Sequence, residues 1–167
     1  MLAGKYDFAK EILKRKNCDP NINNRTTGAT PLHLSVMGAN VEMTRLLLRS
    51  GADLNAKNKD GNTAAHIAAL QSIGVEDSEN DKKVTGEKMR DIMELLLTYD
   101  NINIEMENLE GLTPLGVAAA KGSEEVVRLL LNKGACLITE ETSWPYFGVK
   151  LSCVCPMFAY RKKSNDH

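Results

Sequence analysis

The chain lacks an excess of charge of either sign. Lysine and arginine number 21 against 22 aspartate and glutamate residues, so the formal net charge is −1. A balanced charge provides no global electrostatic attraction to nucleic acid or to an anionic membrane surface. We therefore expect no nucleic-acid partner.

Long apolar runs and a signal-peptide pattern are also missing. No stretch approaches the roughly 20 residues that a helix needs to cross a bilayer. The four cysteines, Cys18, Cys136, Cys153 and Cys155, lie at irregular positions. Such a pattern indicates reduced thiols rather than a disulfide framework. We expect a cytoplasmic location, with the nucleus as a second compartment.

Residues that catalyse reactions or bind metals are scarce. The chain has three histidines, His33, His66 and His167. Nucleophile elbows, phosphate-binding glycine loops and HExxH patterns are absent. Cys153 and Cys155 supply two thiols, and no second pair of Cys or His stands at a spacing suited to zinc. We therefore expect no enzyme activity, no small-molecule substrate, no cofactor and no metal.

The sequence contains a repeated unit instead. Gly28 and Gly61 lie 33 positions apart, and each opens a Gly-x-Thr-x-x-His segment. A third copy opens at Gly111 with Gly-Leu-Thr-Pro-Leu. A unit of fixed length predicts a linear stack in which each copy contacts its neighbours.

Each unit predicts a first helix of about two turns. Thr30 has the chemistry of an N-cap, and Pro31 suits the first helical position because no amide hydrogen is needed there. Leu32, Leu34 and Val36 supply the apolar positions of this helix.

A second helix and a turn complete the unit. Apolar residues recur at helical spacing from Val41 to Leu47, and Gly51 ends this helix. The segment 58–61 then carries turn residues and predicts a projecting, hairpin-like finger. Helices this short are marginal alone in water, so they must bury their apolar faces against neighbouring copies.

These residues resemble the ankyrin-repeat family. The resemblance rests on Thr-Pro-Leu-His at 30–33, the leucine triplet 46–48 and Gly-Ala-Asp-Leu-Asn at 51–55, and it covers roughly residues 5 to 136. It implies an all-α solenoid of stacked helix pairs with hairpin-like loops. It also implies that His33 and His66 bond the adjoining loop, and that Gly116, which takes the histidine position, leaves a looser contact.

Three regions are predicted along the chain. Residues 1–23 resemble the second half of a repeat and form an N-terminal cap, or else the chain starts inside a longer array. Residues 24–136 hold three repeats, and the second contains a polar segment at about 71–86, which predicts a mobile loop before helix resumes near Glu87. Residues 137–167 form a degenerate C-terminal cap or a disordered tail.

The resemblance implies that a partner binds beside each turn glycine and at the end of each first helix. Leu109 and Leu112 are expected to form an exposed apolar pair, shared with Leu70 and surrounded by polar residues. The implied positions on and around the first unit are Thr26, Thr27, Ala29, Met37 and Gly38, with Ala120 on the last. The candidate partner-binding residues are Lys59, Asp60, Asn62, Leu70, Gln71, Leu109, Glu110, Leu112 and Lys121.

Three residues are candidates for covalent modification. Ser78 lies among acidic residues and suits an acidic-directed kinase, or it is an ordinary loop serine. Cys153 and Cys155 have apolar neighbours and precede the basic segment 161–163, a context in which cysteines are acylated. The alternative is two ordinary tail thiols. Acylation would attach the chain to a membrane.

Two functions follow from the resemblance. The first is a protein–protein interaction module that acts as an adaptor, scaffold or inhibitor, similar in outline to the inhibitor-of-NF-kappa-B group. The alternative is an ankyrin segment, or a short isoform, of a larger membrane or signalling protein such as an ankyrin-bearing channel. In both, the partner is another protein whose identity the sequence does not specify.

Overall fold

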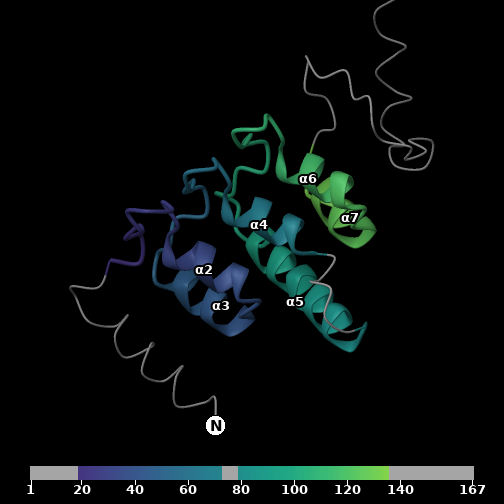
Figure 1. Cartoon of the computed structure of the whole chain (residues 1–167), viewed down its shortest axis with the longest axis horizontal. Helices are drawn as coiled ribbons and strands as arrows, with labels where there is room; N and C mark the ends of the chain where they lie inside the picture. Colours follow the sequence, from purple (N-terminus) through teal and green to yellow (C-terminus); the bar gives the residue numbers. More distant parts are fainter. Residues whose placement is uncertain (1–18, 73–78, 136–167) are drawn as a thin grey trace, which may run out of the picture.

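Six helices in two rows make up the described part of the chain. A computed structural model describes residues 19–72 and 79–135, and within these ranges it contains no strand. Figure 1 shows α2, α4 and α6 in one row and α3, α5 and α7 in a second row beside it. This confirms the predicted all-α solenoid. The helices are α2 (Pro31–Met37), α3 (Val41–Arg49), α4 (Ala64–Leu70), α5 (Glu79–Leu97), α6 (Pro114–Lys121) and α7 (Glu124–Asn132).

The helices of the first row begin at threonine caps. Thr30, Thr63 and Thr113 have extended backbones immediately before α2, α4 and α6, as the repeated Thr predicts. Proline takes the first helical position in α2 and α6, where its missing N–H costs no hydrogen bond. The same local signal therefore sets the start of each helix in this row.

Helix α4 lies at the centre of the core. Every residue from Ala64 to Ala69 is buried, because α2, α5 and α6 pack around this helix. Four of these six residues are alanine, so neighbouring helices approach α4 closely. Large apolar side chains of the second row then fill the space between the rows, among them Leu47, Met89, Ile92, Met93, Leu96 and Leu130.

The second helix of the middle repeat is longer than predicted. Helix α5 starts at Glu79 rather than near Glu87. The prediction of a loop over 71–86 is therefore wrong for residues 79–86. Lysine and glutamate in this segment are good helix formers, and a polar composition therefore suits a helical turn as well as a loop. Residues 73–78 lie outside the described ranges.

The two terminal predictions also fall outside the described ranges. Residues 1–18 and 136–167 are among those not described, so the N-terminal cap and the C-terminal cap or tail stay predictions. Among the helices of the described ranges, none is both long enough and apolar enough to cross a membrane.

Ala39 holds a backbone conformation that suits glycine. Its φ is 49°, and among the described residues it alone combines a positive φ with a side chain. Ala39 follows α2 as Gly122 follows α6, where φ is 73°. The hydrogen bonds that follow the two helices also correspond, because Asn40 N–H donates to Ser35 C=O and Ser123 N–H donates to Ala118 C=O.

Replacing Ala39 with glycine should raise the free energy of unfolding by about 0.5 kcal/mol. The left-handed conformation costs alanine about 1 kcal/mol, and the greater entropy of glycine in the unfolded chain offsets part of the gain. Urea denaturation measures the change. The matched control is Ala120→Gly, an exposed position inside α6, which should lower stability by about 0.5 to 1 kcal/mol. Equal losses in the two variants would contradict the assignment of strain to Ala39.

Candidate functional site

Three turns project from the first row of helices. We name them finger 1 (residues 24–29), finger 2 (56–62) and finger 3 (106–112). In finger 2 the side-chain oxygen of Asn58 accepts hydrogen bonds from the N–H groups of Asp60 (3.0 Å) and Asn62 (2.9 Å). Asn108 repeats both bonds in finger 3, and Asn24 makes related bonds in finger 1. Each finger is therefore closed by its own asparagine.

Backbone hydrogen bonds join the tips of the three fingers. The Lys59 N–H donates to Thr27 C=O, and the Leu109 N–H donates to Asp60 C=O, both at 3.0 Å. The tips form one continuous row, which we call the finger row, along the side of the stack where α2, α4 and α6 begin (Figure 1). The backbones of the three tips are consequently held in fixed order and spacing.

Two buried histidines link α2 and α4 to the finger that follows each helix. Nε2 of His33 lies 3.0 Å from Asn62 O, and Nε2 of His66 lies 2.9 Å from Leu112 O. In both repeats the Thr N–H donates to Nδ1 at 3.1 Å, so the neutral ring carries its proton on Nε2 and donates it to the carbonyl. The expected structural role of these histidines is confirmed.

Burial lowers the pKa of both histidines from the ordinary value of 6.5. For His66 the positive charge of Lys57 lowers the pKa further, and the backbone hydrogen bonds offset part of the effect. Both rings therefore stay neutral at pH 7. A neutral ring fits the hydrogen bonds, because a proton on Nδ1 would remove the acceptor for the Thr N–H.

Asparagine side chains form a second set of hydrogen bonds between successive repeats, at the base of the fingers. Asn21 Nδ2 donates to Gly51 O at 3.3 Å, and Asn21 Oδ1 accepts from Asp53 N at 2.7 Å. Asn55 makes the same pair of bonds to Asn101 O and Asn103 N, each at 2.8 Å. Together with the bonds from His33 and His66, these asparagine bonds fix the spacing between successive fingers.

Several predicted contact residues are exposed as expected. Lys59, Asp60 and Glu110 lie at the finger tips, and Leu109 beside them is 78% exposed. Lys121 is exposed at the last residue of α6. The finger row therefore presents charged side chains around the exposed Leu109.

Leu112 is not exposed as predicted. It is half-buried and packs against the apolar core, although it lies three residues from Leu109 in the same finger. The reason is that the position after the turn glycine belongs to the limb that returns to the stack. Ala29, at the same position of finger 1, is buried. Leu109 and Leu112 therefore do not form an exposed pair.

Asn62 and Gln71 are less exposed than the residues at the finger tips. Asn62 is half-buried, and its side-chain oxygen accepts from Asn108 Nδ2 at 3.0 Å. Gln71 is half-buried at the end of α4, with its side-chain oxygen shielded from solvent. Asn62 thus joins fingers 2 and 3, and the role of both residues in partner contact stays a prediction.

Apolar side chains are also exposed along α2 and α4. Met37 and Leu70, which are 52% and 38% exposed, occupy the last position of their helices, and exposed Ala120 is their equivalent in α6. We call these three residues the helix-end row. Leu70 lies at the far end of α4 from the fingers, about 10 Å along a helix of seven residues, so it does not share one small centre with Leu109.

Leu34 is an exposed residue that the sequence prediction misplaced. It was assigned to the apolar side of α2 and is 54% exposed. Helical residues two positions apart point in nearly opposite directions, so Leu34 cannot share a face with Leu32 and Val36. Stricter use of the helical period would have identified it.

The three candidates for covalent modification stay predictions. Ser78, Cys153 and Cys155 lie outside the described ranges. Within residues 19–72 and 79–135, no group of three or more His, Cys, Asp or Glu side chains is placed to hold a metal ion. The described residues instead form an ordered row of side chains that suits contact with another molecule.

A family model described as ankyrin repeats (3 copies) matches residues 1–77 and 84–141. The chain belongs to the ankyrin-repeat family. Ankyrin repeats generally mediate protein–protein interactions, and the family is typically a non-catalytic interaction module. The finger row and the first row of helices of this ankyrin-repeat chain are thus the structural parts to consider for contact with another protein.

This ankyrin-repeat chain is similar to several curated proteins. It is 35% identical over 109 residues to the mouse B-cell lymphoma 3 protein homolog, a match that covers 64% of the chain and 21% of that protein. An ankyrin repeat protein of fowlpox virus (strain NVSL) is 30% identical over 137 residues, 79% of the chain and 36% of the relative.

The human Notch-regulated ankyrin repeat-containing protein is 46% identical over 55 residues, 32% of the chain and 48% of the relative. The chain thus spans less than half of the length of each of these three relatives.

Proposed function

We propose that this chain is an adaptor, scaffold or inhibitor that binds a partner protein through the finger row and the helix-end row. The observation that carries this proposal is Leu109, which is 78% exposed on a finger whose backbone is fixed by hydrogen bonds to finger 2. A large apolar side chain on a backbone that is already ordered costs less ordering free energy on binding, so contact with it contributes more to affinity.

The surroundings of Leu109 support the same proposal. Asp60 and Glu110 are exposed beside it, and Lys59 is exposed on the neighbouring tip. An apolar residue surrounded by polar ones is the usual composition of a binding hot spot. Met37 and Leu70 add apolar surface on the adjoining helices, so the face that a partner meets extends from the tips to the helix ends.

A comparison of two leucines tests this proposal. Leu109→Ser should leave stability unchanged and weaken binding of the partner by about 2 kcal/mol or more, because the residue is exposed and serves as the anchor. Partners first have to be isolated by affinity capture with mass spectrometry. Isothermal titration with a purified partner then measures the affinity, and thermal denaturation measures stability.

Leu112→Ser is the matched control. Its side chain packs against the core, so this substitution should lower the melting temperature by several degrees. Loss of stability in Leu109→Ser, or unchanged affinity in that variant, would refute the role given to the finger row.

The alternative proposal is that the repeats form a segment of a larger membrane or signalling protein. The observation in favour of this reading is that the matched relatives extend well beyond the aligned region. The coding sequence on either side of this chain distinguishes a segment from a freestanding protein. In either arrangement we expect a location in the cytoplasm or nucleus and a protein as the partner.

A further inference from the structure

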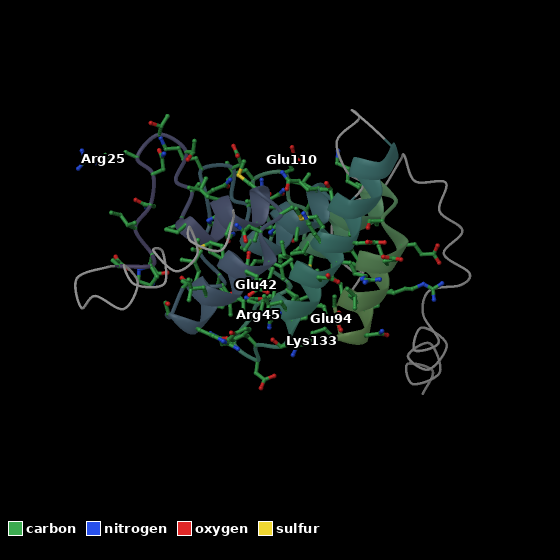
Figure 2. The ribbon with its side chains drawn as sticks, turned by 90° about the horizontal axis from the view of Figure 1, so that it is seen from below. Arg25, Glu42, Arg45, Glu94, Glu110 and Lys133 are labelled. Atoms are coloured by element: carbon green, nitrogen blue, oxygen red, sulfur yellow. The ribbon has the colours of Figure 1, made fainter. Side chains whose placement is uncertain are left out.

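Charges are segregated along the finger row. Finger 1 carries Arg25, finger 2 carries Lys57, Lys59 and Asp60, and finger 3 carries Glu107 and Glu110. All six side chains are exposed. The row is therefore positive at finger 1, mixed with a net positive charge at finger 2, where Asp60 offsets one lysine, and negative at finger 3. Figure 2 shows Arg25 and Glu110 on one edge of the molecule, well separated along it, with Glu42, Arg45, Glu94 and Lys133 toward the opposite edge.

Among the described residues, no salt bridge joins two of the charged finger-row side chains. In the part of the chain that the structure describes, the ion pairs lie on and beside the second row of helices: Arg90 with Asp91 and Glu125, Arg128 with Glu124, and Lys133 with Asp100. Lys57 is the finger-row cation that spans two fingers, and its Nζ donates to the backbone oxygen of Glu107 at 2.7 Å. The finger row thus presents both signs of charge to a partner.

The fixed order of the fingers converts these charges into a linear pattern. The bonds from Lys59 to Thr27 and from Leu109 to Asp60 hold the tips in sequence. Helices that pack side by side lie 8–10 Å apart, so three tips extend over about 20 Å. An extended chain covers that length with about six residues. Leu109 lies on finger 3 next to finger 2, where the net charge of the row changes from positive to negative.

We propose that the finger row binds an extended peptide segment of the partner in which an apolar residue separates acidic residues from basic ones. The acidic half lies over fingers 1 and 2, the basic half lies over finger 3, and the apolar residue contacts Leu109. This inference rests on the proposed function. Complementary charges set the register and direction of a bound segment and exclude segments with the wrong order.

Selection from random peptides tests this charge order. A phage-displayed library of twelve-residue peptides is selected on the full chain at low salt, and the enriched sequences are read. We expect acidic and basic residues on opposite sides of an apolar residue. Fluorescence anisotropy should then show about fivefold to tenfold tighter binding of an enriched peptide than of an isomer with the same residues and shuffled charges. High salt should reduce this difference.

Two charge exchanges provide a matched pair of variants. Lys59→Glu with Glu110→Lys keeps the net charge and should remove the preference for the segregated peptide. Lys88→Glu with Glu94→Lys, at exposed positions of α5, also keeps the net charge and should leave the preference intact.

The outcomes separate this inference from the proposed function. The charge order alone is overturned if the enriched peptides need Leu109 but show no charge order. It is also overturned if their binding is unaffected by the Lys59 and Glu110 exchange. Peptides that bind the Leu109→Ser variant equally well, or a failure of any peptide to be enriched, overturn both. Sedimentation of the full chain gives a further check, because a dimer that dissociates in the Lys59 and Glu110 variant would assign the finger row to a second copy.

Discussion

Replacing Gly61 with alanine should lower the free energy of unfolding by about 3 kcal/mol, whereas Gly111→Ala should lower it by about 1 kcal/mol. Both glycines have positive φ, 75° and 71°, so both substitutions introduce the same backbone strain. They differ in their surroundings. A Cβ on Gly61 would lie 2.7 Å from Leu109 N and 3.1 Å from two backbone atoms of Asn108, and a Cβ on Gly111 would have nothing within 4 Å.

The difference between the two variants measures the contact between fingers 2 and 3. Backbone atoms cannot rotate away as a flexible side chain does, so Gly61→Ala must push finger 3 outward and lengthen the bond from Leu109 to Asp60. Equilibrium urea denaturation gives both values. If the two variants lose the same stability, finger 3 moves freely and the finger row is not rigid.

Replacing His66 with alanine should also lower the free energy of unfolding by about 3 kcal/mol. The substitution removes a fully buried side chain and leaves the carbonyl of Leu112 and the N–H of Thr63 without their partners. A loss of this size is a large part of the total stability of a small domain. Thermal and urea denaturation measure it.

His66→Asn separates the two functions of the ring. An asparagine oxygen can replace Nδ1 as the acceptor for Thr63 N–H, and the shorter side chain cannot reach Leu112. The variant should therefore be intermediate in stability between the natural chain and His66→Ala. Stability equal to that of the natural chain would show that the bond to Leu112 contributes nothing.

The dependence of stability on pH gives an independent readout for His66. Its pKa is lowered in the folded state, so its contribution to stability is fully present above the unfolded value of 6.5 and is lost as the pH falls from 6.5 toward the lowered pKa. The slope from one histidine cannot exceed about 1.4 kcal/mol per pH unit. The His66→Asn variant should show a shallower loss between pH 7 and 5 than the natural chain.

The helix pairs could be predicted from the sequence because their signals are local. A threonine cap, a proline at the first position and a glycine after the helix each act within about one turn of backbone. The pairing of His33 and His66 with the next finger followed from the family resemblance. The same repeat position occupied twice by histidine already indicated a structural role.

Other features depended on packing that the sequence does not encode locally. Leu109 and Leu112 have the same side chain in the same turn, and only the path of the backbone decides that one is exposed and the other is half-buried against the core. The start of α5 was missed because polar composition permits both helix and loop. The segregation of charge along the fingers depends on the stack, which places three tips from distant parts of the sequence side by side.

The backbone bonds between the fingers also provide two local reporters. The amide of Lys59 is protected by finger 1, and the amide of Leu109 is protected by finger 2. Separation of the first unit from the second exposes the Lys59 amide to solvent, and separation of the second from the third exposes the Leu109 amide. Hydrogen exchange at these two amides therefore distinguishes fraying from the two ends of the array, without unfolding either helix pair.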